Sequence, residues 1–438
     1  MNRRFFLKTA FAAGVSGAAG GHPGAFAAVA DAGRLPAWQK GELQVHFLYA
    51  GSSESVFMIM PDGTTLLVDV GDYDVGGNWK MRNPIAPLGG RGPGKFVADY
   101  VKRANPSGAK VDYWLLTHWH ADHGGCETSY SAREERDGEI WFKSGLAELI
   151  DDISFGRGLD RCWPNRNDPF ECADTSVRQF AHIARTYRWL ERHRGLKIEK
   201  FRVGADDQIR MLKDPAAYPD FGVLNICGNG VIRTRDGGTR NLYADFVPRG
   251  KADVWRRENG LSCGFVVSYG AFRLFSAGDF QDFWKKDDGT TFQTEDALAA
   301  EVGRVDVAKT NHHASDSMTP ALVKALAPRV WVTSSVSGYS DWPTTKARLS
   351  DRSIYAGDRL LCSTYYHLKE RVAEMGEAAA KDDVAPESFE PNHVVVTVPP
   401  GGRTYTITHL APDDSFAVRR VRTVKRKTNC ANRRRLFV

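Results

Sequence analysis

The run from Thr117 to Gly125, Thr-His-Trp-His-Ala-Asp-His-Gly-Gly, constrains this 438-residue chain more than any other feature. It places three imidazoles and one carboxylate within six positions, directly after an apolar stretch at 111–117 that predicts a buried strand. Side chains alternate along an extended backbone, so His118 and His120 point to the same side and can reach one ion. Asp122 and His123 follow where the strand ends and can address a second ion. The run therefore predicts a metal centre at a strand end.

The ligand types indicate which ion and which role to expect. Imidazole and carboxylate ligands without thiolate favour Zn²⁺, with Mn²⁺ or Fe as alternatives, in a catalytic rather than a structural site. The alternative is a loop of surface histidines. The dense spacing and the preceding buried strand argue against it.

The remaining pattern predicts a layered α/β protein. Helices are expected at 96–103, 176–193, 294–302 and 319–326, and strands at 43–49, 55–60, 65–69, 111–117, 222–226, 264–269, 273–276, 305–309 and 330–333. Blocks of strands interleaved with helices suit an α/β sandwich. The long polar segment at about 127–222 is expected to be an insertion that shapes the mouth of a cleft.

The histidine run resembles the His-x-His-x-Asp-His signature of the metallo-β-lactamase superfamily, and the resemblance extends over most of residues 43–400. It implies a four-layered αββα sandwich, here at 43–410. By the same resemblance, Asp69 orients a ligand histidine and Asp279, at the end of Leu-Phe-Ser-Ala-Gly-Asp, bridges two metals. His312 is implied to be the last metal ligand, with His313 and Ser315 facing substrate.

A narrower resemblance is to the metallo-β-lactamase domain of bacterial competence DNA-uptake proteins. It rests on Val-His-Phe-Leu at 45–48, Glu-Asn-Gly-Leu-Ser at 258–262 and His-His-Ala-Ser at 312–315. That domain is thought to act as a nuclease or phosphodiesterase, so the resemblance implies phosphodiester substrates. The chain departs from it at Ala314, where glycine is expected.

One histidine common in the superfamily has no counterpart here. Only His182 and His193 fall between the histidine run and Asp279, and both lie in the predicted helix at 176–193, where neither can be a ligand. Asn259 is the nearest candidate for that corner, as a weak ligand or a partner to a metal-held water. The alternative is that Asn259 belongs to a simple turn. The site is therefore expected to hold one or two ions.

These residues lead to the hypothesis of a metal-dependent hydrolase that uses a metal-activated hydroxide on phosphodiester or other ester bonds. Asp122 and Asp279 would position the hydroxide, and His313 would donate a proton to the leaving group or bind an anionic substrate. One alternative is a β-lactam, lactone or thioester hydrolase, since fold alone does not fix the substrate. Another is a non-catalytic envelope binding protein with a vestigial metal site.

The N-terminus predicts export. Asn-Arg-Arg-Phe-Phe-Leu-Lys at 2–8, followed by a small weakly apolar stretch and Ala-Phe-Ala at 25–27, resembles a twin-arginine signal. The alternative is an ordinary secretory signal. We expect the twin-arginine export machinery as a partner, a signal at 1–27, a linker at 28–42 and a periplasmic or secreted protein. No later apolar run is long enough to span a bilayer.

Charge is concentrated at the two ends of the chain. Residues 419–435 contain nine basic residues and no acid, and the first eight residues contain three more, so the formal charge of +6 leaves a body near −6. The body shows no global nucleic-acid footprint, although nucleic acid stays among the substrates considered. The basic tail at 411–438 would be solvated and mobile, or would contact phosphates or acidic lipids. Cys162 and Cys172 are expected to form a local disulfide.

Overall fold

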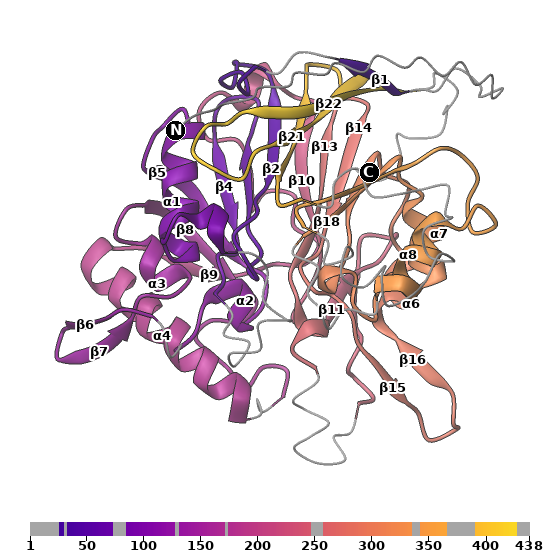
Figure 1. The fold of residues 1–438 in the computed structure, drawn as a ribbon. Helices are drawn as coiled ribbons and strands as arrows, with labels where there is room; N and C mark the ends of the chain where they lie inside the picture. Colours follow the sequence, from indigo (N-terminus) through magenta and orange to yellow (C-terminus); the bar gives the residue numbers. More distant parts are fainter. Residues whose placement is uncertain are drawn as a thin grey trace, which may run out of the picture.

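The structure is a computed structural model that describes residues 26–29, 33–72, 85–127, 131–170, 174–246, 257–334, 342–365 and 390–426. The chain is a mixed α/β protein built on two large sheets (Figure 1). The predicted strands and helices are confirmed, with ends that differ by a few residues. Within the described residues, no helix has both the length and the apolar character needed to cross a membrane.

The first sheet has ten strands. In spatial order they are β1 (Phe26–Val29), β22 (Val418–Lys425), β21 (Thr404–Leu410), β20 (His393–Val398), β2 (Leu43–Phe47), β3 (Val56–Ile59), β4 (Thr65–Val68), β5 (Lys110–Leu116), β8 (Ser154–Asp160) and β9 (Ile198–Lys200). Pairing is antiparallel from β1 to β4 and parallel from β4 to β9.

The second sheet has eight strands. Their spatial order is β12 (Thr239–Asn241), β11 (Val231–Arg233), β10 (Phe221–Gly228), β13 (Gly264–Tyr269), β14 (Phe272–Ser276), β17 (Val307–Lys309), β18 (Val330–Thr333) and β19 (Leu360–Ser363). The strands from β14 to β19 are parallel, and the others pair antiparallel.

The two sheets share one apolar core. Val45 and Leu115 of the first sheet and Val267 and Val307 of the second belong to the same buried cluster, so one face of each sheet is packed against the other. A second cluster joins the first sheet to α1 (Pro93–Ala104), α3 (Leu146–Leu149) and α4 (Asp174–Arg194). A third joins the second sheet to α6 (Thr294–Ala299), α7 (Pro320–Leu326) and α8 (Trp342–Ser350). Helices therefore cover the outer face of both sheets (Figure 1).

Four parallel strands deliver the polar side chains of interest from their carboxyl ends. β4 is followed by Asp69 and its parallel neighbour β5 by the histidine run; β14 is followed by Asp279 and its parallel neighbour β17 by His312 and His313. Carboxyl ends of parallel neighbours lie at the same edge of a sheet, which is where ligands bind in open α/β sheets. The topology thus gathers residues far apart in sequence.

The expected insertion at 127–222 is largely part of the first sheet. β8 and β9 continue the parallel ladder from β5, and α3 and α4 pack on the same sheet. Among the described residues of this range, only β6 (Arg133–Arg136) and β7 (Glu139–Phe142) form a separate two-stranded hairpin, as β15 (Phe283–Lys285) and β16 (Thr291–Gln293) do later. The sequence analysis did not predict β8, because its sequence, Ser-Phe-Gly-Arg-Gly-Leu-Asp, has neither an apolar run nor an alternation of apolar and polar residues.

Part of the expected basic tail is also a strand. β22 pairs with β21 over 418–425, inside the range 411–438 that was expected to be solvated and mobile. Val418 and Val424 are buried, whereas Arg419 and Arg420 are exposed. The high density of basic residues indicated a solvated tail, although β22 also has buried valines. Residues 427–438, and residues 1–25 of the expected signal, lie outside the described residues.

Candidate metal centre

The histidine run is held in place by a close approach of two backbone segments. His118 follows β5, His120 is extended, and α2 (Ala121–Gly124) carries Asp122 and His123. The backbone N–H of Val70 donates to the carbonyl of His123 at 2.8 Å. At Gly71 a side chain would collide with the backbone of Asp122, so glycine is required for this turn to pack against the end of β4.

Asp69 fixes the orientation of two histidines at once. Its Oδ2 accepts a hydrogen bond from His123 Nδ1 at 2.8 Å and another from Thr117 Oγ1 at 2.7 Å. Because the Thr117 hydroxyl donates to Asp69, it accepts from His118 Nδ1, which lies 3.1 Å away. Nδ1 therefore carries a proton in both histidines, and Nε2 is the nitrogen that each presents to a ligand.

Those Nε2 atoms face carboxylates of the second sheet. His123 Nε2 lies 3.2 Å from Asp279 Oδ2, and His118 Nε2 lies 3.9 Å from the same oxygen. His118 Nε2 is also 3.1 Å from His120 Nδ1, so the ring nitrogens of His118 and His120 face each other.

His313 completes the group from the other side. Its Nε2 lies 3.2 Å from Asp122 Oδ2 and 3.5 Å from Asp279 Oδ2, while its Nδ1 lies 3.0 Å from the carbonyl of Ser334. A carbonyl can only accept, so Nδ1 carries the proton and Nε2 faces the carboxylates. His313 is held like His123, with a backbone carbonyl in the place of Asp69.

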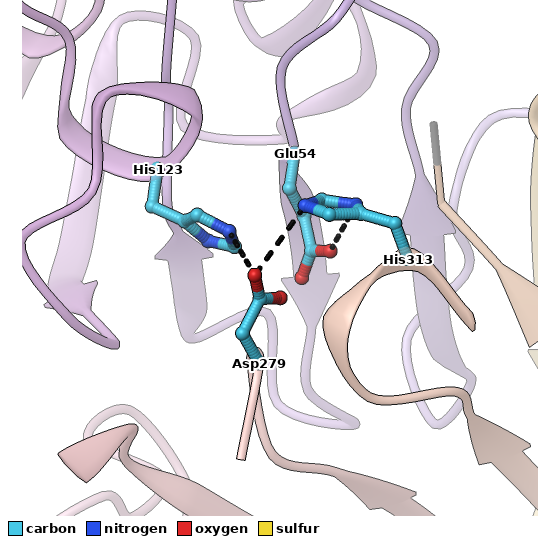
Figure 2. Close-up of side chains that lie close together, drawn as sticks. All are labelled: Glu54, His123, Asp279 and His313. Atoms are coloured by element: carbon cyan, nitrogen blue, oxygen red, sulfur yellow. Dashed lines mark ion pairs between the residues drawn. The ribbon is translucent and has the colours of Figure 1, made fainter. Parts of the chain in front are cut away.

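Four buried residues bring potential ligand atoms together. Glu54, His123, Asp279 and His313 each offer one ligand atom, and these atoms all lie within 4.8 Å of one another. Figure 2 shows Asp279 between the two imidazoles and Glu54 beside His313. Glu54 Oε2 lies 3.6 Å from His313 Nδ1. The group could hold a metal ion, since it combines nitrogen and carboxylate donors of the kind that divalent transition metals bind.

Strong mutual electrostatics mark the cluster. Burial would raise the pKa of Asp279, but His123 and His313 outweigh it and hold that pKa well below its usual range. Burial would likewise raise the pKa of Asp122, which His123 and His313 instead lower to about 2. In return, and against the effect of burial, Asp279 raises the pKa of His123 well above its ordinary value and that of His313 to about 9. Perturbed groups of opposite sign in one buried place are typical of functional sites.

Several buried atoms of the cluster lack a hydrogen-bond partner within the described part of the chain. They are Glu54 Oε2, His123 Nε2, Asp279 Oδ1 and His312 Nδ1. A buried acceptor without a partner costs about 1–3 kcal/mol, and more when it is charged. A cation coordinated by these atoms would remove that cost, so the residues present fit a metal ion.

The two adjacent histidines occupy different positions. His313 belongs to the four-residue group. His312 lies outside it, as do His118, His120 and Asp122, and its expected role as a metal ligand stays a prediction. The imidazoles of the pair lie 6.4 Å apart, and three successive residues, His312, His313 and Ala314, have positive φ. This left-handed backbone turns the second histidine toward Asp122 and Asp279. The backbone N–H of Ser315 donates to the carbonyl of His312 at 2.6 Å.

A second network holds Trp119, the residue between His118 and His120. Glu258 Oε1 accepts from the Trp119 backbone N–H at 2.9 Å, and Asp160 Oδ2 accepts from its indole N–H at 3.0 Å. Arg161 pairs with both oxygens of Glu258, at 2.8 and 2.9 Å, and its guanidinium lies 3.6 Å from the Trp119 ring centroid. Hydrogen bonds therefore fix both the backbone and the indole ring of Trp119.

Asn259 follows Glu258 in the 3₁₀ turn η4 (Asn259–Leu261). It is buried, and its Oδ1 has no hydrogen-bond partner among the described residues. His182, by contrast, contacts the carbonyl of Ser144, and His193 pairs with Asp137 on the surface. Among His182, His193 and Asn259, only Asn259 has a buried side-chain acceptor, Oδ1, without a hydrogen-bond partner in the described part of the chain.

Two residues of this region escaped the sequence patterns. Glu54 is the only acid between Glu42 and Asp62, inside an otherwise neutral, apolar stretch, and that isolation is a usable signal. Lys309 ends β17, where a lysine is easily taken for a solvated strand end, yet it is fully buried. The prediction of a disulfide at Cys162 is wrong, because Cys162 is a free thiol that contacts the carbonyl of Asn165. Its expected partner, Cys172, lies outside the described residues.

Comparison of the chain with models of known protein families gives no match, and comparison with curated proteins gives none either. The resemblance described above is therefore carried by the residues themselves.

Proposed function

We propose that this chain is a metal-dependent hydrolase whose centre is built from His118, His120, Asp122, His123, Asp279 and His313. The observation that carries the proposal is the orientation of the imidazoles. The Nδ1 atoms of His118, His123 and His313 are each engaged by an oxygen acceptor, which leaves the Nε2 atoms directed at the carboxylates Asp122 and Asp279. A bound cation would take the place of a proton on these Nε2 atoms, and neutral imidazoles fixed in this way are the usual form of metal-ligating histidine.

The donor set favours a catalytic role. It contains imidazoles and carboxylates but no thiolate, which suits Zn²⁺, Mn²⁺ or Fe. The centre is also open on one side, because the Asp122 side chain is 23% exposed and His120 is half-buried, whereas His118, His123 and Asp279 are buried. Structural metal sites are closed, and catalytic ones keep a position for water or substrate.

The residues can then divide the work. A divalent ion held here would acidify a water ligand and stabilise developing negative charge on the substrate. Asp122, the most exposed carboxylate of the group, would orient the attacking water and accept its proton. In this proposal His313 is a ligand rather than a proton donor, because Ser334 engages Nδ1 and the carboxylates face Nε2.

The packing supports assigning the fold to the metallo-β-lactamase type, a four-layered αββα sandwich. Two sheets share one apolar core, and each is covered on its outer face by helices. The Zn²⁺ centre would lie at the carboxyl ends of four strands drawn from both sheets. The pairing of His312 and His313 favours phosphodiesters over other esters by resemblance to DNA-uptake domains.

Export by the twin-arginine route belongs to the same proposal, supported by Arg3, Arg4 and the Ala-Phe-Ala sequence at 25–27. A folded metalloprotein suits a route that carries folded cargo. Fractionation of cells that express the wild type and an Arg3→Lys, Arg4→Lys variant tests it. Export that persists in the variant would point to the ordinary secretory route.

The hydrolase proposal is tested with purified protein lacking the signal. We expect about one or two Zn²⁺ ions per chain by atomic emission, and turnover of bis-p-nitrophenyl phosphate that a chelator abolishes. His123→Ala should lose both metal and turnover, whereas His193→Ala, which removes an exposed histidine of α4, should keep both. Turnover of a chromogenic cephalosporin but not of the phosphodiester would change the substrate class. A wild type that binds no metal would refute the proposal.

A further inference from the structure

Lys309 is a fully buried lysine beside the centre. Its Nζ contacts three oxygens, Glu54 Oε1 at 2.9 Å and the carbonyls of Gly278 at 2.9 Å and Thr310 at 3.0 Å. Three acceptors match the three N–H donors of an ammonium group, so the charge is buried with its hydrogen bonds satisfied. Gly278 immediately precedes Asp279, so the bond to its carbonyl links this ammonium to the segment that supplies the central carboxylate. A side chain at Gly278 would collide with Thr117.

The two oxygens of Glu54 have different surroundings. Its side chain is 1% exposed, one oxygen pairs with Lys309, and Oε2 has no hydrogen-bond partner among the described residues. Its backbone N–H donates to the carbonyl of Asp122 at 2.8 Å, which ties the residue to the histidine run. Oε2 is the oxygen nearest to His313, and Glu54 belongs to the group whose ligand atoms lie within 4.8 Å (Figure 2).

An ion pair that serves only the fold would have different hydrogen bonding. Removing a carboxylate from water is costly, and a pair that only supports the fold is expected to satisfy both oxygens. Here one oxygen is satisfied by Lys309, and the other faces His313 at 3.6 Å without a hydrogen bond from any described residue. The geometry is that of a carboxylate shared between an internal cation and an ion still to be bound.

We propose that Lys309 is the internal counter-ion of the metal centre, a positioning residue that anchors Glu54 by one oxygen and limits the affinity of the centre for divalent cations. This inference rests on the proposed metal-dependent function. Two physical effects act together: the ammonium repels an incoming cation through a medium of low dielectric, and it occupies an oxygen that could otherwise bind the ion. Glu54 in turn attracts the cation and supplies an oxygen ligand.

The expected effects of substitution have opposite signs. Lys309→Met removes the positive charge with little change of volume and should tighten Zn²⁺ binding at least tenfold, because both effects above are lifted. Glu54→Gln keeps an oxygen for Lys309 but removes the negative charge, and should weaken Zn²⁺ binding at least tenfold. Lys324→Met removes the same charge from the exposed face of α7 and should leave affinity within twofold of the wild type.

The experiment measures Zn²⁺ dissociation constants by competition with a chromophoric chelator, together with the melting temperature of each metal-free protein. Without metal, Lys309→Met should melt lower than the double variant Lys309→Met, Glu54→Gln, because only the single variant buries a carboxylate that has lost its lysine partner. A Lys309→Met protein that binds Zn²⁺ no more tightly than the wild type would overturn the inference. A Glu54→Gln protein whose Zn²⁺ dissociation constant is within twofold of the wild-type value would also overturn it, and this variant is expected to fold in either case. If the wild type itself binds no Zn²⁺, the proposed function fails and this inference with it; failure of the variants alone leaves the proposed function standing.

Discussion

Replacement of Asp69 by asparagine isolates the tautomer-fixing role of one carboxylate. Asp69 is fully buried and accepts three hydrogen bonds, at Oδ1 from the Thr117 backbone N–H and at Oδ2 from the Thr117 hydroxyl and His123 Nδ1. Asparagine has the same shape but only one acceptor oxygen. Its NH₂ group must therefore face at least one of these donors, whichever way the amide is turned.

Both orientations of the amide have a cost. If the NH₂ group replaces Oδ1, it opposes the backbone N–H of Thr117. If it replaces Oδ2, His123 must present Nδ1 as an acceptor and carry its proton on Nε2, the nitrogen that faces Asp279. One unsatisfied buried donor costs about 1–3 kcal/mol of unfolding free energy. Loss of such an orienting carboxylate weakens metal binding roughly 10–100-fold.

The assay combines two measurements on Asp69→Asn. Urea unfolding of the metal-free protein should show a loss of about 2 kcal/mol, and chelator competition should show weaker Zn²⁺ binding by at least tenfold. Asp207→Asn, which removes an exposed carboxylate paired with Arg202, serves as the matched control and should change neither value. A folded Asp69→Asn protein that binds Zn²⁺ as tightly as the wild type would refute the reasoning, because the imidazole orientation would then not depend on this carboxylate.

Three further predictions concern stability. Glu258→Gln should lower the urea-unfolding free energy by about 3 kcal/mol, because it leaves the buried Arg161 guanidinium without its counter-charge; a loss below 1 kcal/mol would contradict this. Burial lowers the pKa of both His46 and His393 to about 3, so below pH 6.5 the unfolded chain binds more protons than the folded one, and unfolding free energy should fall by about 1.4 kcal/mol per pH unit for each histidine. Burial raises the pKa of Glu295 to about 7 and those of Asp282 and Asp306 to about 6, which acts with the opposite sign in the same range, so urea titrations at pH 7.5, 6 and 5 compare the wild type with His46→Gln. An equal pH dependence in the two proteins would exclude the prediction. Adding Zn²⁺ to metal-free protein at a hundred times its dissociation constant should raise unfolding free energy by about 2.7 kcal/mol, and an unchanged urea midpoint would show that the folded state has no Zn²⁺ site.

The elements that could be predicted from sequence are those whose burial is written into a local pattern. β13 and β14 are buried along their whole length and mostly apolar, and they were predicted within one residue of their ends. β8 and β22 were missed because glycines and arginines occupy positions that a strand fills only when its neighbours supply the ladder. In both cases pairing with β5 or β21 overrides weak local preference.

The candidate site divides in the same way. Residues 118–123 form a contiguous motif, and Asp279 closely follows a clear strand, so both could be named in advance. Glu54 and Lys309 meet only because β3 and β17 belong to different sheets that pack together, and no local spacing encodes that contact. The place of His313 in the four-residue group depends on three consecutive left-handed residues, a backbone geometry that sequence alone gives no reason to expect outside glycine.

The location of the centre has a thermodynamic consequence. His118, His123 and Asp122 come from the first sheet, whereas Asp279 and His313 come from the second, and the contacts between the two groups are side-chain contacts among ionisable residues. An ion bound by both groups would link the two sheets at the edge where their strands end, in addition to the apolar core they share. Because such a preformed site does not exist in the unfolded chain, binding free energy at this position becomes folding free energy. Metal affinity and the stability of the sheet pair should therefore change together when any of these ligands is replaced, whereas replacement of a residue that only supports one sheet should change stability alone.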